Sequence, residues 1–186
     1  MKSPFDKPVP DRPARIAGVA LLGLLLVLLA LRGGWVVAHA RSFVPVGGGE
    51  VAPAFKLPLL TGGEVAVGTG ERQVTVLDFF ATWCEPCREA LPHVDALARR
   101  YQERGVRFIA VDAEDIGSRP AVKFIAERLR LTLPIALGGE EVSGLYKINT
   151  LPTTVIIGRD GSISRVLVGV HSEEELARHI DRALGQ

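Results

Sequence analysis

The chain has 186 residues, 47% of them hydrophobic, and a formal net charge of +1. Residues 51–186 carry 16 Lys or Arg against 18 Asp or Glu, a balance that argues against nucleic-acid binding. One long apolar stretch lies near the start, and the remaining length suffices for a single compact domain.

The N-terminal segment combines basic residues with an apolar run. From Ile16 to Leu31 every residue is apolar or glycine, and the apolar character resumes after Arg32. A tilted membrane-spanning helix needs about 20 mostly apolar residues, so we predict that residues 16–38 form an uncleaved anchor. Ala38-His39-Ala40 also fits a signal-peptide cleavage site, and a buried helix of the domain is a third interpretation.

The charges around this run predict its orientation. More cations precede the run, in residues 1–15, than follow it in the short stretch after it. By the positive-inside tendency, residues 1–15 form a cytoplasmic basic tail and the domain lies outside the cytoplasm. Residues 39–50 are rich in glycine and are predicted to be a flexible linker, with the globular domain in residues 51–186.

The domain begins with a predicted hairpin, followed by a predicted central strand. Phe55–Leu59 and Glu64–Val67 flank Thr61-Gly62-Gly63, a turn sequence that allows positive φ. Val74–Phe80 is a nearly continuous β-branched and aromatic run, which is typical of a strand buried on both faces of a parallel sheet.

Helices and strands then alternate. Apolar residues recur at helical spacing from about Glu85 to Glu103, and Val106–Val111 is a second strand of the buried type. Ser118 is a predicted N-cap and Pro120 a first-turn proline for the next helix. This alternation predicts a right-handed crossover between parallel strands.

The C-terminal part has a different pattern. Thr153–Ile157 and Ile163–Val168 are predicted strands joined at Asp160-Gly161, a hairpin turn. Ser172 opens a last helix, and Glu175 three residues later completes a capping box.

The two cysteines lie in Trp83-Cys84-Glu85-Pro86-Cys87, where the central strand passes into a helix. Free N–H groups and the helix dipole favour thiolate at Cys84, which we expect to attack a partner disulfide. Cys87, one turn later and more buried, would then resolve the mixed disulfide. Half of a zinc site is the alternative, but a second cysteine pair is missing and the four histidines are scattered, so we expect no metal or cofactor.

Two further residues are candidates for the site. Asp78 lies within the apolar strand, where burial is expected to raise its pKa, so it is a candidate general base for the thiol of Cys87. Pro152 enters a predicted strand, at a position that does not donate to the ladder, and a cis bond before it is plausible.

The cysteine motif, Pro92, Leu151-Pro152-Thr153-Thr154 and the preceding hairpin together resemble the membrane-anchored TlpA, ResA and DsbE type of the thioredoxin superfamily. The resemblance covers residues 51–186. It implies an α/β, thioredoxin-like three-layer fold with a central mixed sheet and an N-terminal β-hairpin extension, preceded by one transmembrane or signal helix. It further implies a cis-proline loop at Pro152 that faces the dithiol, with Thr153 beside it.

The sequence departs from this family at the dithiol helix. Relatives often carry a Glu three residues after the second cysteine, where this chain has Ala90; Glu89 lies one place earlier, on another side of the helix. We therefore assign the proton-handling role to Asp78. Glu85 is expected to modulate Cys84, as are Trp83 and Pro86 of the motif.

The resemblance implies a thiol-disulfide oxidoreductase in the bacterial inner membrane, with a single span and a periplasmic or extracytoplasmic catalytic domain. It would take electrons from a membrane thiol donor and reduce a client disulfide or cysteine pair, for example in an apocytochrome c. A general disulfide oxidant is one alternative, and the reduction potential decides between the two directions.

A second alternative is copper delivery, or reduction of copper-site cysteines during oxidase assembly, because thiolates suit Cu(I). His93 is the nearby candidate ligand, although a solvated helix face is its more ordinary environment. A peroxidase finds no support beyond the two cysteines. The acidic residues Asp112, Glu114 and Asp115 form either a solvated loop or a selector of cationic clients.

Overall fold

The computed structural model describes residues 21–32, 48–68 and 72–185. The chain divides into an N-terminal unit, Met1–Phe43, and a larger unit, Val44–Gln186. In the first unit, residues 21–32 are helical. None of the described helices combines the length and the apolar character that a membrane crossing requires. Most of the predicted anchor and linker, including residues 16–20 and 33–47, lies outside the described residues.

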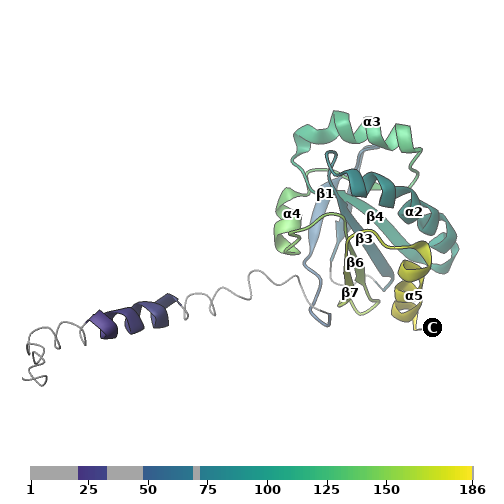
Figure 1. Ribbon diagram of the computed structural model, residues 1–186. Helices are drawn as coiled ribbons and strands as arrows, with labels where there is room; N and C mark the ends of the chain where they lie inside the picture. Colours follow the sequence, from purple (N-terminus) through teal and green to yellow (C-terminus); the bar gives the residue numbers. More distant parts are fainter. Residues whose placement is uncertain (1–20, 33–47, 69–71, 186) are drawn as a thin grey trace, which may run out of the picture. The chain divides into compact units, whose positions relative to one another are not determined.

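Five strands form the central sheet of the larger unit, in the order β5-β4-β3-β6-β7. Figure 1 labels four of them, β4, β3, β6 and β7. β3 (Val74–Phe80), β4 (Val106–Asp112) and β5 (Ile135–Ala136) run parallel to one another. β6 (Thr153–Ile157) and β7 (Ile163–Val168) are antiparallel to their neighbours. The sheet is therefore mixed, which confirms the predicted α/β fold with a central mixed sheet; the transmembrane or signal helix of the same prediction is not confirmed.

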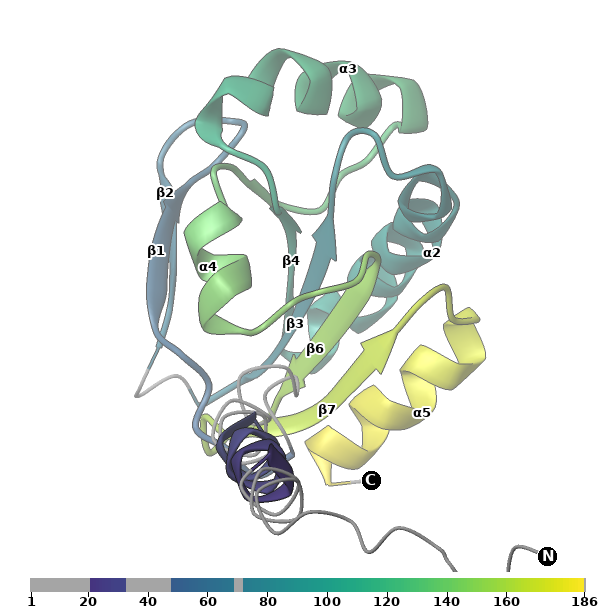
Figure 2. The ribbon, with the colours of Figure 1, turned by 60° about the vertical axis from the view of Figure 1, so that its left-hand side comes forward.

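Helices cover both faces of the sheet (Figure 2). One core cluster joins the sheet to three helices, α2 (Glu85–Tyr101), α3 (Arg119–Leu129) and α5 (Glu173–Leu184). The cluster on the opposite face holds α4 (Glu140–Leu145) and the hairpin of β1 (Phe55–Pro58) and β2 (Glu64–Val67). The fold thus has three layers, with the hairpin as the expected N-terminal extension.

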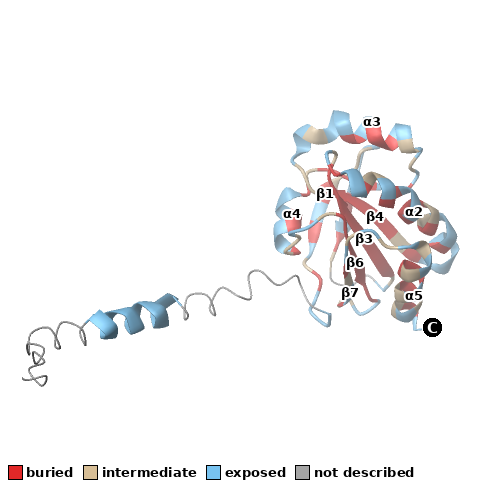
Figure 3. Ribbon diagram, viewed as in Figure 1, coloured by how far each residue is buried: buried red, intermediate tan, exposed pale blue. Residues whose placement is uncertain are grey.

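β3 occupies the centre of the domain, and all seven of its residues are buried (Figure 3). Successive side chains of a strand point to opposite faces. Val76 and Phe80 accordingly belong to the cluster under α2, whereas Leu77 and Phe79 belong to the cluster under the hairpin. This two-sided burial explains the continuous apolar run, because a strand between two helical layers has no solvent face.

The N-terminal hairpin forms as predicted, with Phe55 opposite Val67 and positive φ at Gly62 and Gly63. Backbone pairing begins before it, because Glu50 accepts from Ile163 over 2.7 Å and Val51 bridges Ser162. The chain therefore joins the β6-β7 hairpin slightly before the predicted domain start at residue 51.

α3 starts at the expected residue, but its predicted cap is wrong. Ser118 occupies the N-cap position without a side-chain hydrogen bond to the helix. Its hydroxyl instead donates to the carboxylate of Asp112 and to the carbonyl of Asp115. A buried carboxylate at the end of β4 thus competes successfully with the helix for this hydroxyl. The last helix does have its cap, since the Glu175 N–H donates to the Ser172 hydroxyl over 3.2 Å.

β5 and α4 were not predicted from the sequence. β5 has two residues and α4 six, too few for a periodic pattern to appear. α4 begins where Gly139 donates to the Asp112 carbonyl over 2.8 Å. A Cβ on Gly139 would lie 2.5 Å from that carbonyl oxygen, so only glycine allows the approach.

Candidate active site

Cys84 and Cys87 form a disulfide at the start of α2. Cys84 is the N-cap residue, and its Sγ accepts from the Cys87 N–H over 3.3 Å. Both side chains are buried, Cys84 with 4% exposure and Cys87 with none. The predicted place of Cys84 at a helix N-terminus is confirmed, and Cys84 is the more accessible of the two. The order in which they react remains a prediction.

The backbone just before Cys84 is held from two sides. The Thr82 N–H donates to the carboxylate of Glu114, which comes from the loop after β4. The Thr82 carbonyl accepts from Arg88 Nη1 over 2.9 Å, and Arg88 also pairs with Glu85. A backbone bond from Ala113 N–H to the Phe80 carbonyl, 2.8 Å long, joins the same two loops. The dithiol turn is therefore fixed by α2 and by the loop after β4.

Asp78 is buried on the face of β3 that packs under α2. We call the core cluster on this face, which contains Cys84 and Cys87, the dithiol cluster. The parity of the strand places Asp78 with Val76 and Phe80, which pack in the same cluster as both cysteines. One carboxylate oxygen accepts from the Thr154 hydroxyl over 2.8 Å, and the other has no hydrogen-bond partner among the described residues. Burial raises the pKa of Asp78 to about 7, and the Thr154 hydrogen bond only partly offsets this. The predicted direction of the pKa is confirmed.

The loop before β6 has the cis peptide bond between Leu151 and Pro152 that the resemblance implied. The Thr153 hydroxyl donates to the Thr150 carbonyl over 2.7 Å and closes the turn. The Pro152 carbonyl accepts from Gly169 N–H over 2.9 Å. The loop is thus tied to the end of β7.

Trp83 separates two hollows on the surface. With 71% exposure it is among the most exposed large apolar side chains of the domain. One hollow, of about 350 Å³, runs from Trp83 to Thr150 and Leu151, so the dithiol turn faces the cis-proline loop. The other, of about 490 Å³, lies between the dithiol turn and α3. A molecule that reaches Cys84 therefore meets a hollow on either side of Trp83.

The remaining motif residues lie at the outer edge of the site. Glu85 is exposed and its charge is compensated by Arg88. Pro86 occupies the first turn of α2, where its missing N–H leaves no helix bond unmade. Ala90 is buried and Glu89 exposed, so Glu89 does not point into the dithiol cluster. This supports placing the proton-handling role at Asp78, which remains a prediction.

The acidic segment after β4 is not simply a solvated loop. Asp112 is fully buried and accepts from the Ser118 hydroxyl and the Glu114 N–H. Burial raises the pKa of Asp112 to about 6, and the neighbouring charges of Glu114 and Asp115 act in the same direction. Of the three acidic residues in this segment, only Asp115 is exposed. Selection of cationic clients by this segment remains a prediction.

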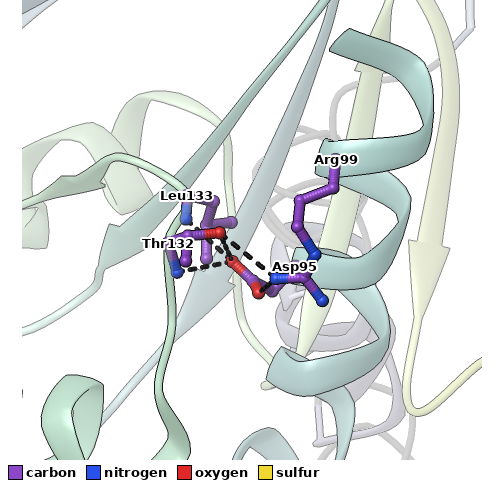
Figure 4. Close-up of polar contacts among 4 residues, drawn as sticks. All are labelled: Asp95, Arg99, Thr132 and Leu133. Atoms are coloured by element: carbon purple, nitrogen blue, oxygen red, sulfur yellow. Dashed lines mark hydrogen bonds and ion pairs between the residues drawn. The ribbon is translucent and has the colours of Figure 1, made fainter.

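Asp95 is a buried polar residue whose role was not predicted from the sequence. Its carboxylate accepts from the backbone N–H groups of Thr132 and Leu133, over 2.7 and 2.8 Å, and pairs with Arg99 (Figure 4). Burial acts to raise the pKa of Asp95, but these hydrogen bonds outweigh it and lower the pKa. The sequence did contain a signal for this role, because Asp95 stands next to apolar residues on the predicted helix. The contacts assign Asp95 to scaffolding, since they tie α2 to the segment entering β5.

His93, the candidate metal ligand near the dithiol, lies beside an acidic residue of α5. His93 is exposed and its Nδ1 lies 3.2 Å from Glu173 of α5. No group of three or more His, Cys, Asp or Glu side chains suited to a metal ion occurs among the described residues. The chemistry that the site shows is that of the dithiol: in its disulfide form it can accept two electrons from a thiol pair.

A family model for the AhpC/TSA family matches residues 48–166. The thiol-disulfide oxidoreductase ResA of Geobacillus kaustophilus is 32% identical over 162 residues, which cover 85% of this chain and 91% of ResA. The thioredoxin-like protein YneN of Bacillus subtilis is 28% identical over 167 residues, or 87% of this chain and 96% of YneN.

Solved structures agree with these relatives. A Chlorobium tepidum protein assigned as the thiol:disulfide interchange protein DsbE is 30% identical, with a TM-score of 0.68 over 75% of this chain and 99% of its own. StoA of Bacillus subtilis is 25% identical, with a TM-score of 0.60 over 69% of this chain and 97% of its own. The family match over residues 48–166 includes the dithiol helix α2 and the strands β3, β4, β5 and β6.

Proposed function

Because this chain belongs to the AhpC/TSA family and is a thioredoxin-like thiol-disulfide oxidoreductase of the ResA type, we propose that it reduces client disulfides outside the cytoplasm. The observation that carries this proposal is the Cys84–Cys87 pair at the N-terminus of α2, beside an exposed Trp83 and the cis-proline loop. An enzyme of this kind needs an accessible first sulfur, a second sulfur within one turn and a surface that holds the client.

The reaction conserves electrons and protons. In the reduced enzyme the Cys84 thiolate attacks the client disulfide, which forms a mixed disulfide and releases the first client thiol. The Cys87 thiolate then attacks Sγ of Cys84, which closes the enzyme disulfide and releases the second client thiol. Each client sulfur leaves as a thiolate and takes up a proton. The first proton comes from solvent and replaces the one that Cys84 lost when it became a thiolate; the second is the Cys87 proton, which Asp78 accepts as Cys87 attacks and then passes to the second client sulfur. The client thus gains two electrons and two protons, and the two cysteines of the enzyme lose them.

The electrons come from a thiol donor in the membrane. Outside the cytoplasm a dithiol is not kept reduced by the cytoplasmic thiol pool, so each turnover has to end with reduction of the Cys84–Cys87 disulfide. A cysteine pair of an apocytochrome c is a suitable client, because haem attachment requires free thiols. This choice rests on the resemblance of the cysteine motif and of Leu151-Pro152-Thr153-Thr154 to the TlpA, ResA and DsbE type.

The N-terminal segment serves as a single-pass anchor in the inner membrane, with residues 1–15 in the cytoplasm. The proposal rests on the apolar run from Ile16 to Leu31 and on the cations before it. Membrane fractionation of the full chain tests it: the protein should stay with the membranes after alkaline carbonate extraction. Release into the soluble fraction, with a new N-terminus at Arg41, would instead support signal-peptide cleavage.

The reduction potential of the full chain tests the direction of the reaction. Equilibration in glutathione and dithiothreitol buffers should give a value near or below about −270 mV, the value of thioredoxin, if the enzyme is a reductant. A value close to about −120 mV, the value of DsbA, would make it an oxidant and would overturn the client assignment. The family and the fold would stand in either case.

A further inference from the structure

The hollow between the dithiol turn and α3 has a defined chemistry. We call it the α3 groove: it has a volume of about 490 Å³, and its walls include Trp83 and Arg88 on one side and Ala121, Phe124, Ile125 and Arg128 on the other. The four α3 positions are spaced by three, one and three residues, so they form one stripe of the helix. α3 therefore presents a single continuous face to the turn that carries Cys84.

Two exposed aromatic side chains line the groove. Phe124 is 62% exposed and Trp83 71% exposed, and the two aromatic side chains line the same groove. Aromatic side chains left in water at a concave site are typical of the anchor points of protein interfaces. The neighbouring residue Ile125 is buried, so the stripe is firmly attached to the core.

The charges of the groove favour a negatively charged ligand. Arg88 and Glu85 pair with each other and compensate. Arg128 is exposed and has no ion-pair partner among the described residues. It lies one helical turn after Phe124, on the same stripe. The groove therefore places an uncompensated positive charge next to an apolar patch.

We propose that the α3 groove is a client-binding surface, and that it selects clients with a bulky apolar residue and an acidic residue close to the reactive cysteine. The inference rests on the proposed function and deepens it. A client whose disulfide reaches Cys84 lies beside Thr82 and Trp83, both of which line the groove. Its neighbouring residues then contact Phe124 and Arg128, and this contact contributes affinity without touching the sulfurs.

The test uses the reduced full chain in detergent and three cyclic disulfide peptides. They differ only next to the first cysteine, which is followed by Leu-Asp, Leu-Lys or Ser-Asp. Hydroxyethyl disulfide serves as a small neutral substrate that cannot fill the groove. Oxidation of the dithiol is followed by tryptophan fluorescence, and kcat/KM is measured for each substrate.

The expected result has three parts. Wild type prefers the Leu-Asp peptide to both others. Phe124→Ala lowers kcat/KM for this peptide roughly five- to thirtyfold, the range of a lost aromatic anchor. Arg128→Glu lowers it roughly threefold or more and turns the preference toward Leu-Lys, because the new carboxylate repels Asp. Rates with hydroxyethyl disulfide stay within about twofold of wild type in both variants, which locates the effect outside the dithiol.

Two control variants lie outside the groove, one on α3 and one in the segment just before α3. Lys123→Glu makes the same charge change on α3, outside the groove, and Ile116→Ala removes another exposed apolar side chain. Both should leave the peptide rates unchanged. Equal losses in the controls, or unchanged rates in Phe124→Ala and Arg128→Glu, would overturn the proposal.

Two other outcomes are distinguishable. If wild type reduces neither the peptides nor hydroxyethyl disulfide, the proposed function itself fails. If sedimentation shows a dimer of the wild type that Phe124→Ala dissociates, a second copy of the chain covers the groove, and the client proposal is wrong.

Discussion

Asp78 lies in the strand that leads to the dithiol, and its environment is that of a proton acceptor. Asp78 is 1% exposed, and its carboxylate has the Thr154 hydroxyl as its one hydrogen-bond donor among the described residues. Burial raises the pKa of Asp78 to about 7, so near neutral pH the carboxyl is protonated in part of the molecules and ionised in the rest. General bases work best when their pKa lies close to the working pH.

Asp78→Asn should slow disulfide exchange near neutral pH and leave the fold intact. The amide keeps the volume and the acceptor for Thr154 but takes no proton, so resolution by Cys87 should lose roughly tenfold or more in rate. Stopped-flow oxidation by hydroxyethyl disulfide measures this from pH 6 to 9. Wild-type rates across that range would remove Asp78 from the mechanism. Asp78→Ala is a poorer variant because it also opens a cavity.

At the scale of elements, two carboxylates join segments that are distant in sequence. Asp95 ties α2 to the segment before β5, and Glu114 ties the loop after β4 to the dithiol turn. The sequence predicted the strands and helices involved but neither tie. The sequence around Asp95 and around Glu114 is also compatible with an ordinary solvent-exposed carboxylate.

Asp95→Ala should destabilise the oxidised protein by about 3 kcal/mol or more, because it leaves the N–H groups of Thr132 and Leu133 without their acceptor. Asp95→Asn should cost less, since one acceptor oxygen remains. Arg99→Ala is the matched control: it removes the partly exposed ion-pair partner and its exposed hydrogen bond to the Thr132 hydroxyl but leaves the acceptor for both N–H groups, so its cost should stay below about 1 kcal/mol. Urea unfolding of the three variants measures these differences. Equal costs for Asp95→Ala and Arg99→Ala would contradict the scaffolding role.

Glu114→Ala should loosen the dithiol turn, because the Thr82 N–H loses its acceptor, at a cost of about 1–2 kcal/mol. Glu114→Gln keeps an acceptor oxygen and should retain most of the stability. Glu89→Ala removes an exposed carboxylate of α2 and serves as the control. Hydrogen exchange at the Thr82 amide gives a local readout. Unchanged exchange in Glu114→Ala would mean that other contacts hold the turn.

For the whole molecule, the buried carboxylates predict how stability depends on pH. The folded pKa of Asp78, about 7, lies above its ordinary value of 3.8, and that of Asp112 is about 6. Groups with a raised folded pKa contribute fully below their unfolded pKa and lose that contribution as pH rises through the folded value. The lowered pKa of Asp95 acts the other way and costs stability only when the pH falls below about 4.

The oxidised protein should therefore lose stability as the pH rises from about 4 to 8, by up to about 4 kcal/mol from Asp78. Asp78→Asn should remove most of this slope, and Asp112→Asn the smaller part at lower pH. Urea unfolding at pH 5, 6, 7 and 8 measures the slope. A slope that is the same in wild type and Asp78→Asn would show that the Asp78 carboxyl does not titrate in this range.

The sequence by itself determined the features that depend on neighbouring residues. The dithiol at a helix start, the buried strand with Asp78 inside it and the hairpin turn at Gly62 all follow from local periodicity and turn chemistry. The short elements β5 and α4 were not predicted, because each is too short to show a periodic pattern. The Ser118 cap failed because the hydroxyl found a stronger acceptor in Asp112.

Only the tertiary structure decided which distant residues meet around the dithiol. Glu114 reaches Thr82 across 32 positions, Asp95 reaches Thr132 across 37, and the α3 stripe lines a groove with Trp83. A local pattern specifies which face of a helix or strand is apolar. It does not specify which polar or aromatic side chain of another element comes to lie against it, because that depends on how the layers pack.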